Sequence, residues 1–160
     1  MQSATTSPSQ DSQGCGSTST PYCYEGSLKT DDNEVRGELT VHACSISMKV
    51  LWLARLARPD LQKAVCDLAR NITKWAASDD KRGGRLTGYL QFSQNYRLVG
   101  KVIDEAPNRS LGLYVDADFC GKETSTRSTS GGWLALMGPN GTMMPLAWVC
   151  KRQSATSRST

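Results

Sequence analysis

The stretch Leu-Gly-Leu-Tyr-Val-Asp-Ala-Asp-Phe-Cys-Gly at residues 111–121 sets the architecture expected for the C-terminal half of the chain. Side chains of a β-strand point alternately to its two faces, so every second residue shares a face. One face of this stretch carries Tyr114, Asp116 and Asp118. The opposite face is apolar throughout and consists of Leu111, Leu113, Val115, Ala117 and Phe119. We therefore predict a strand whose apolar face can be buried and whose other face presents two carboxylates.

Asp116 and Asp118 need an explanation, because carboxylates are depleted in strands and are almost never buried without a partner. One explanation is a hard cation such as Mg²⁺, which is usually held by one or two protein carboxylates beside phosphate groups. The other is that the strand ends in solvent, with Asp118 at the start of a turn. The spacing alone favours the second explanation. Asp104 and Glu105 lie in the preceding loop and are predicted to face solvent.

The residues that follow predict a β-hairpin. A polar loop precedes the sequence Ser-Thr-Ser-Gly-Gly and an apolar run, which together span 128–137. Asn140-Gly141 is the residue pair that type I′ hairpin turns prefer. The returning strand, 144–149, contains Pro145, which has no backbone N–H to donate and therefore predicts a bulge or a sheet edge.

Residues 37–95 predict a helical segment of two to three helices. In the first helix, apolar residues recur at spacings of three and four, which is typical of one buried face; they are Leu39, Ala43, Ile46, Val50, Leu53 and Ala57. Pro59 ends this helix and can begin the next. The apolar stripe of the second helix is Leu61, Val65, Leu68, Ile72 and Trp75. A third helix is predicted from Ser78, whose hydroxyl can cap it, although the glycines at 83, 84 and 88 weaken it.

Composition and charge limit the size of the fold and the kinds of partner that the chain can have. The 160 residues suffice for one ordinary domain, are 38% hydrophobic and have a formal net charge of +4. This mild charge does not by itself indicate nucleic acid, but no acidic residue follows Glu123, whereas Lys151 and Arg152 lie in that last part. A local excess of positive charge suits a phosphate backbone and is equally compatible with a basic terminus that has no partner.

The first 36 residues are predicted to be a disordered polar tail and linker, since Ser, Thr and Gln dominate up to about Thr20. They lack the basic start and apolar core of a signal peptide, and no run of about 18 apolar residues occurs anywhere. We therefore expect an intracellular protein, cytoplasmic or nuclear. The six cysteines contain no Cys-x-x-Cys pair, which argues against a structural zinc site.

The order of these motifs resembles the ribonuclease H domain of copia-type retrotransposon Pol polyproteins. The motifs are the Asp-bearing strand, the Ser-Thr-Ser-Gly loop, the hairpin, and Lys-Arg-Gln at 151–153 before a Ser-x-Ser-Thr end. Leu-Ala-Arg-Leu-Ala-Arg-Pro-Asp-Leu at 53–61 resembles the segment that joins reverse transcriptase to ribonuclease H there. The resemblance implies an α+β fold, in which the helical segment 37–95 precedes an incomplete ribonuclease H-like mixed sheet with antiparallel hairpin strands at 96–160.

In that family, ribonuclease H cleaves the RNA strand of an RNA/DNA hybrid with two divalent ions, Mg²⁺ or Mn²⁺. The resemblance makes Asp116 the central catalytic and metal-bridging carboxylate and gives Asp118 a weaker, supporting role. The nucleic-acid-binding residues that it implies are Ser128, Ser130, Gly131, Lys151 and Arg152. Ordinary turn and surface chemistry is the alternative for these five residues.

The same resemblance predicts that the catalytic site is incomplete. In the family a second metal ligand is a Glu on the helix after a Ser-Thr, and here the sequence ends at Ser159-Thr160. The Tyr-x-Asp-Asp type motif of the polymerase is absent as well. We expect a polyprotein fragment whose partners are an RNA/DNA hybrid or other nucleic acid and the rest of Pol, without polymerase activity or appreciable hybrid cleavage. The alternatives are a non-catalytic nucleic-acid-binding module and a non-functional transposon relic.

Overall fold

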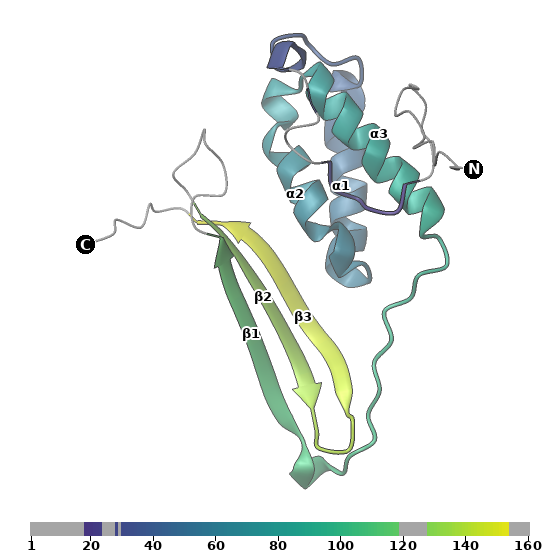
Figure 1. Cartoon of the computed structure of the whole chain (residues 1–160), viewed down its shortest axis with the longest axis vertical. Coiled ribbons are helices and arrows are strands. Elements are labelled where there is room, and N and C mark those ends of the chain that lie inside the picture. Colours follow the sequence, from purple (N-terminus) through teal and green to yellow (C-terminus); the bar gives the residue numbers. More distant parts are fainter. Residues whose placement is uncertain (1–17, 24–27, 29, 119–127, 154–160) are drawn as a thin grey trace, which may run out of the picture.

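The computed structural model describes residues 18–23, 28, 30–118 and 128–153. The predictions for the tail up to residue 17, for 119–127 and for the Ser/Thr-rich end at 154–160 lie outside these residues. Within them, three α-helices precede a three-stranded sheet, so the fold is α+β as predicted (Figure 1). The elements are α1 (Thr40–Leu56), α2 (Gln62–Arg70), α3 (Ala77–Phe92), β1 (Ser110–Asp118), β2 (Thr129–Met137) and β3 (Met143–Arg152).

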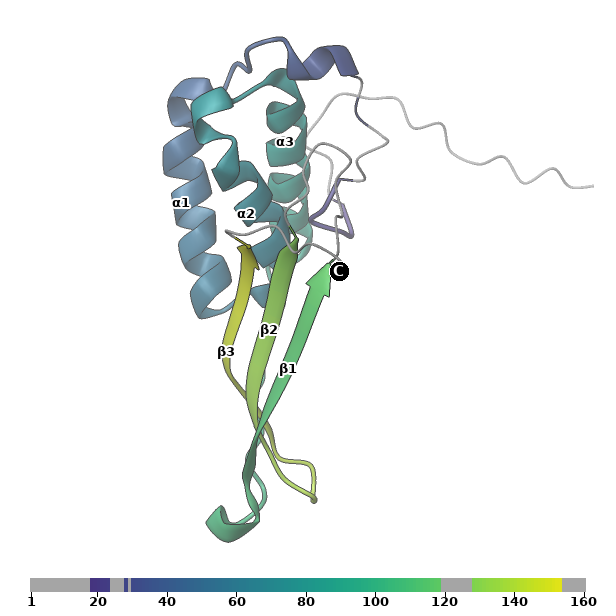
Figure 2. The same ribbon diagram turned by 90° about the vertical axis from the view of Figure 1, so that its left-hand side faces the viewer.

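The helices pack beside one another, and the sheet extends away from them (Figures 1 and 2). The loop between β2 and β3 lies at the far end of the sheet. At the near end, Trp148 Nε1 donates to the carbonyl oxygen of Ala54 in α1 at 2.7 Å. The Cys66 thiol of α2 lies 3.5 Å from the carbonyl oxygen of Cys150 in β3. One end of the sheet is therefore docked on the helices through β3.

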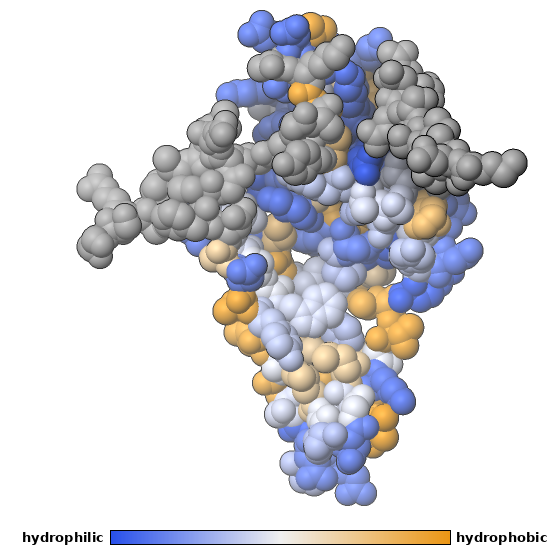
Figure 3. All heavy atoms as spheres, viewed as in Figure 1, coloured by the Kyte–Doolittle hydropathy of each residue, from blue (hydrophilic) through white to orange (hydrophobic). Residues whose placement is uncertain are grey.

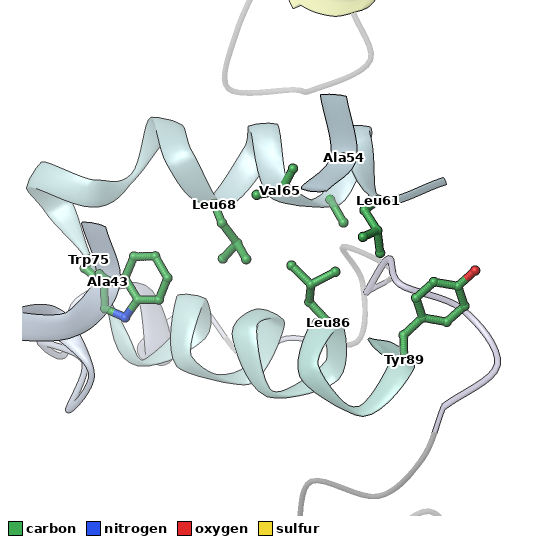
Figure 4. Close-up of a cluster of buried hydrophobic side chains, with 9 residues drawn as sticks. Ala43, Ala54, Leu61, Val65, Leu68, Trp75, Leu86 and Tyr89 are labelled. Atoms are coloured by element: carbon green, nitrogen blue, oxygen red, sulfur yellow. The ribbon is translucent and has the colours of Figure 1, made fainter. Parts of the chain in front are cut away.

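The hydrophobic core lies between the three helices (Figure 4). The predicted stripe of the second helix is buried at four positions, which are Leu61, Val65, Leu68 and Trp75. Ile72, the fifth member of that stripe, is only partly buried, because α2 ends at Arg70 and a 3₁₀ turn follows. The predicted start at Pro59 is confirmed as a 3₁₀ turn, Pro59–Leu61, that leads into α2.

The buried face of α1 differs from the predicted one. Ile46 and Ala57, which the apolar spacing selected, are exposed. Ala43 is buried as predicted, and Ser47 and Ala54, which the spacing did not select, are buried as well. Small side chains at a contact allow two helices to approach closely. A pattern that counts large apolar residues therefore misses part of a contact face built from small ones.

Arg58 joins the three helices through a buried polar network. It lies after α1, is 8% exposed and forms an ion pair with Asp60 at 2.7 Å. It also donates to the carbonyl and hydroxyl oxygens of Ser93, after α3, at 3.1 and 2.6 Å. Tyr89 donates its hydroxyl to Asp60 at 2.7 Å, and the guanidinium lies 5.7 and 5.8 Å from the ring centres of Tyr89 and Tyr96. Burial works to raise the pKa of Asp60, but the hydrogen bonds from Arg58 and Tyr89 outweigh it and lower that pKa.

Asp79, and not Ser78, caps the start of α3. The helix begins at Ala77, so Ser78 lies inside the first turn and is buried. The Asp79 carboxylate accepts a hydrogen bond from the backbone N–H of Ala76 at 3.1 Å. The helix continues through the glycines at 83, 84 and 88, with Leu86 and Tyr89 buried in the core.

The three strands form an antiparallel sheet in the order β1-β2-β3, and β2 and β3 form the predicted hairpin. The predicted type I′ turn is wrong. The turn hydrogen bond runs from the N–H of Gly141 to the carbonyl oxygen of Gly138 at 3.2 Å, so its central residues are Pro139 and Asn140. A type I′ turn needs positive φ at both central residues, which proline cannot adopt. Gly141, at φ +99°, takes the left-handed conformation after the turn.

Pro145 lies on an edge strand and beside a β-bulge, as its missing N–H predicted. The pairs on the two sides of the bulge are Ala135–Pro145 and Leu134–Ala147. Leu146 therefore has no pairing partner in β2. One extra residue in β3 shifts its register by one, which exchanges the faces of all residues beyond it.

The predicted burial of the apolar face of β1 is wrong for the described residues. Leu111, Leu113 and Val115 are 66%, 66% and 74% exposed. The opposite face, with Tyr114 and Asp116, is the one that the register places on the same side as Trp148, whose indole reaches α1. Hydrophobic residues accordingly appear at the surface in the half of the molecule that the sheet forms (Figure 3).

Asp104 is buried and holds the hairpin loop, contrary to the prediction that it faces solvent. Its carboxylate accepts hydrogen bonds from the N–H groups of Asn140 at 2.9 Å and Thr142 at 3.1 Å. Thr142 Oγ1 in return accepts from the N–H of Asp104 at 2.8 Å. Hydrogen bonds from Thr142 and then Asn140 lower the pKa of Asp104 below its ordinary value of 3.8. Glu105 is exposed, as predicted.

Tyr89→Phe is expected to lower the free energy of unfolding by about 1 kcal/mol, because it removes the hydrogen bond to Asp60 and keeps the ring. Urea unfolding followed by circular dichroism measures this. Tyr96→Phe is the matched control, since that half-exposed ring lies beside the same guanidinium. Equal stability of the two variants would contradict the network.

Asp104→Asn is expected to flatten the acid dependence of stability. A lowered pKa in the folded state stabilises the fold at pH values above about 4 and is lost as the pH falls through the folded pKa. The thermal midpoint of the wild type should therefore drop more steeply below about pH 4 than that of the variant. Glu105→Gln, at the neighbouring exposed carboxylate, should keep the wild-type slope.

Candidate nucleic-acid interface

The pairing of the strands brings the predicted catalytic and nucleic-acid-binding residues to one end of the sheet. The pairs are Asp116–Gly131, Ser130–Lys151, Asp118–Thr129 and Thr129–Arg152. Ser128 directly precedes β2. All seven nominated positions therefore lie at the end of the sheet where β1 and β3 finish, which is also the end docked on the helices (Figure 1).

The nominated residues are divided between the two faces of the sheet. Asp116, Gly131 and Arg152 lie on the face that turns toward the helices. Ser130 and Lys151 lie on the opposite, aliphatic face. Neither Lys151 nor Arg152 forms an ion pair with another residue in the described ranges. Both cations are therefore available to an anionic partner.

Gln153 forms hydrogen bonds with two serines at this end of the sheet. The sequence analysis did not single out this residue. Its backbone N–H donates to the carbonyl oxygen of Ser128 at 2.8 Å, and its side-chain amide donates to Ser130 Oγ at 2.9 Å. Ser128 is 4% exposed, so its side chain is buried and not presented to a ligand. The Ser130 hydroxyl keeps its own proton for donation, because it accepts from Gln153.

A two-metal site does not fit the described residues. Two dications about 4 Å apart require several converging carboxylates. In the described part of the chain, no three His, Cys, Asp or Glu side chains converge on one point. Asp116 is exposed on β1 and supplies one carboxylate, while the side chain of Asp118 lies outside the description. Asp116 alone does not hold such a pair of ions.

An aromatic row runs across the helix-facing side of the sheet. Tyr114, Trp133 and Trp148 occupy neighbouring positions on β1, β2 and β3. The rings of Trp133 and Trp148 stack with centroids 5.6 Å apart and an interplanar angle of 23°. The sequence contains these aromatic residues, but the unshifted register of a plain hairpin would place Trp148 on the other face. The bulge predicted at Pro145 is the sequence feature from which this row could have been predicted.

Cys66 of α2 and Cys150 of β3 lie beside this row, with the Cys66 thiol 3.5 Å from the carbonyl oxygen of Cys150. A hydrogen bond from Cys66 lowers the pKa of Cys150 to about 6, and the positive charge of Lys63 contributes in the same direction against desolvation. The pKa of Cys66 is raised, first by its hydrogen bond with Cys150 and then by burial. A lowered pKa favours the thiolate of Cys150, and the thiolate is the nucleophilic form.

No family model matches the sequence, and no solved structure matches the chain. Among the helices of the described residues, none has the length and apolar character that crossing a bilayer requires. The arrangement of the site is thus the basis for a functional proposal.

Alkylation by iodoacetamide is expected to modify Cys150 rapidly at neutral pH, with a rate that reaches half its maximum near pH 6 because the thiolate reacts. Mass spectrometry of tryptic peptides over a pH series measures this. Cys66→Ala should move the half-maximum to higher pH, since it removes the hydrogen-bond donor, whereas Cys44→Ala, at an exposed thiol of α1, should leave it in place. An inflection above about pH 8 in the wild type would contradict the coupling.

Proposed function

We propose that this chain is a copia-type retrotransposon Pol segment and that its sheet end binds an RNA/DNA hybrid, or related nucleic acid, without cleaving it. The observation that carries the proposal is that the residues implied by the resemblance, which come from three strands and from Ser128 just before β2, lie at one end of the sheet. The three-stranded antiparallel sheet, with an acid near the end of its first strand, is what a leading part of a ribonuclease H-like sheet would contain.

The charges at this end favour a polyanionic partner. Lys151 and Arg152 follow one another at the end of β3 and so project from opposite faces of the sheet. Such cations can contact phosphates on two sides of one strand end. Ser130 Oγ and the bare backbone of Gly131 lie in the same rows and can approach a phosphate or a 2′-hydroxyl.

Binding, and not cleavage, is the activity proposed for these residues. Hydrolysis through two metal ions needs a carboxylate set that Asp116 does not supply alone. Asp116 would instead repel a phosphate or accept from a sugar hydroxyl, which sets the register of a bound strand.

The alternative of a non-functional relic is favoured by one observation, the exposure of Leu111, Leu113 and Val115 on the uncovered sheet face. Exposed apolar patches of this kind mark either an interaction surface or an aggregation liability. Gel filtration of the purified chain separates the two: a monodisperse peak supports the binding module, and soluble aggregates support the relic.

Binding of a fluorescently labelled RNA/DNA hybrid, followed by anisotropy, should weaken steeply between about 50 mM and 200 mM salt. Lys151→Ala and Arg152→Ala should each reduce affinity without sequence preference and lower the salt slope by about 1, because each removes one phosphate contact. Lys101→Ala is the matched control, since Lys101 is an exposed cation beside β3 at the hairpin end of the sheet.

Equal losses in Lys101→Ala and Lys151→Ala would place binding elsewhere and overturn the assignment. Clear Mg²⁺-dependent cleavage of the hybrid that is lost in Asp116→Asn would contradict the non-cleaving activity. Absence of hybrid binding at low salt by a monodisperse sample would overturn the proposed function as a whole.

A further inference from the structure

A cavity of about 510 Å³ lies between the first turns leading into α2 and the helix-facing side of the sheet. The helical side of its lining includes Asp60, Gln62 and Lys63. The sheet side includes the aromatic row, described above, together with Asp116 and Gly131. This volume is within the range of small-molecule sites, and a mostly apolar lining with a few polar groups is their usual character.

Gly131 leaves the sheet side of the cavity open. A Cβ built on Gly131 would have only the carbonyl oxygen of Asp116 near it, at 3.9 Å. Gly131 and Trp133 are two residues apart on β2 and so share the helix-facing side. The space above Gly131 is therefore bordered along the strand by the ring of Trp133, whose stacking partner Trp148 lies on the next strand.

Gln62 lines the same cavity and carries a buried hydrogen-bonding group that its protein neighbours leave unused. It is 7% exposed, and its Oε1 is buried with no hydrogen-bond partner in the described structure. A buried polar atom without a partner is costly, and each such atom in a folded protein calls for a reason. The last torsion of a glutamine side chain is soft, so a ligand that donates a hydrogen bond can draw this oxygen toward itself.

We propose that this cavity binds an adenine base, carried by a nucleoside, a nucleotide or an unpaired position of a strand. Bases stack on aromatic side chains such as Trp133. A glutamine carboxamide pairs in bidentate fashion with adenine, accepting from the N6 amino group and donating to N7. Adenine thus supplies both the flat surface that the aromatic row fits and the donor that Gln62 Oε1 lacks.

Lys63 and Asp116 define what surrounds the base. The Lys63 side chain is 42% exposed and lies 3.6 Å from Asp67, so its ammonium is at the mouth and can reach a 5′-phosphate. The Asp116 carboxylate, on the sheet side, can accept from a ribose hydroxyl. A 5′-phosphate is therefore expected to improve binding modestly, while the base itself provides the selectivity.

This inference does not rest on the proposed function. Free adenosine has no phosphate, so its binding is independent of Lys151 and Arg152. A chain that binds adenosine but no hybrid would overturn the proposed function alone, and the reverse result would overturn the adenine site alone.

Isothermal titration calorimetry of the full chain with adenosine and with purine riboside, which lacks only the N6 amino group, tests the proposal. Adenosine should bind about tenfold more tightly, since one hydrogen bond to a buried acceptor is at stake. In Gln62→Leu the two nucleosides should bind equally, because the acceptor is gone. This double comparison isolates the contact from any general effect of the substitution.

Gly131→Val should weaken adenosine binding by occupying the space beside the ring of Trp133 where the base would lie, and valine suits a strand position. Gly84→Ala is the matched control, because a Cβ there meets nothing within 4 Å and lies on α3 away from the cavity. Circular dichroism confirms that both variants fold; if Gly131→Val does not, the Gln62→Leu comparison decides by itself.

Two further ligands distinguish the sources of the base. Oligoadenylate that binds more tightly than AMP, and loses this binding in Gly131→Val, indicates a base presented by a strand; an affinity for oligoadenylate no greater than that for AMP indicates a free nucleoside or nucleotide. No saturable binding of any adenine compound at millimolar concentration, or equal binding by wild type and a folded Gly131→Val, would overturn the proposal.

Discussion

The extra residue in β3 is the constraint on which the functional surface depends. Pro145 cannot donate to β2, and the register shifts beside it, leaving Leu146 unpaired. Since strand side chains alternate, this shift by one residue turns Trp148, Cys150 and Arg152 to the side that carries Asp116. The stacked tryptophans, the thiol pair with α2 and the cavity all follow from that exchange of faces.

Buried polar groups hold the parts of the molecule that apolar packing does not. The helices share an apolar core, and Arg58 adds a network that reaches the ends of α1 and α3 and the start of α2. The sheet has one fully buried apolar residue among its described positions, Ala135. Its distal loop is instead fixed by the Asp104 carboxylate, which satisfies backbone N–H groups that would otherwise have no partner. A few buried hydrogen bonds thus hold the distal end of the sheet, where a second hydrophobic core is lacking.

The two faces of the sheet have different roles because they have different surroundings. The helix-facing side offers aromatic rings and a glycine with open space above it, and α2 adds a carboxamide oxygen without a partner, which together suit a flat polar ligand. The aliphatic side is exposed along β1, with Lys151 at its end. An extended strand that crosses the sheet end would contact cations on both sides and leave the aromatic row to an unstacked base. Hybrid binding and adenine binding both involve Asp116 and Gly131, but the first relies on the cations and the second on the aromatic row and Gln62.

The sequence alone determined the α+β class, a segment of two to three helices, the second buried stripe, the hairpin and the irregularity at Pro145, because each follows from short-range periodicity or from one residue's backbone chemistry. It also nominated residues that the register later brought to one end of the sheet. Only the tertiary structure decided which faces are buried. The contact face of α1 uses Ser47 and Ala54, Asp104 finds its partners some 38 positions away along the chain, and the apolar side of β1 remains uncovered among the described residues. These outcomes depend on which elements contact one another in the folded chain, and a sequence pattern within one element carries no information about its contacts with the others.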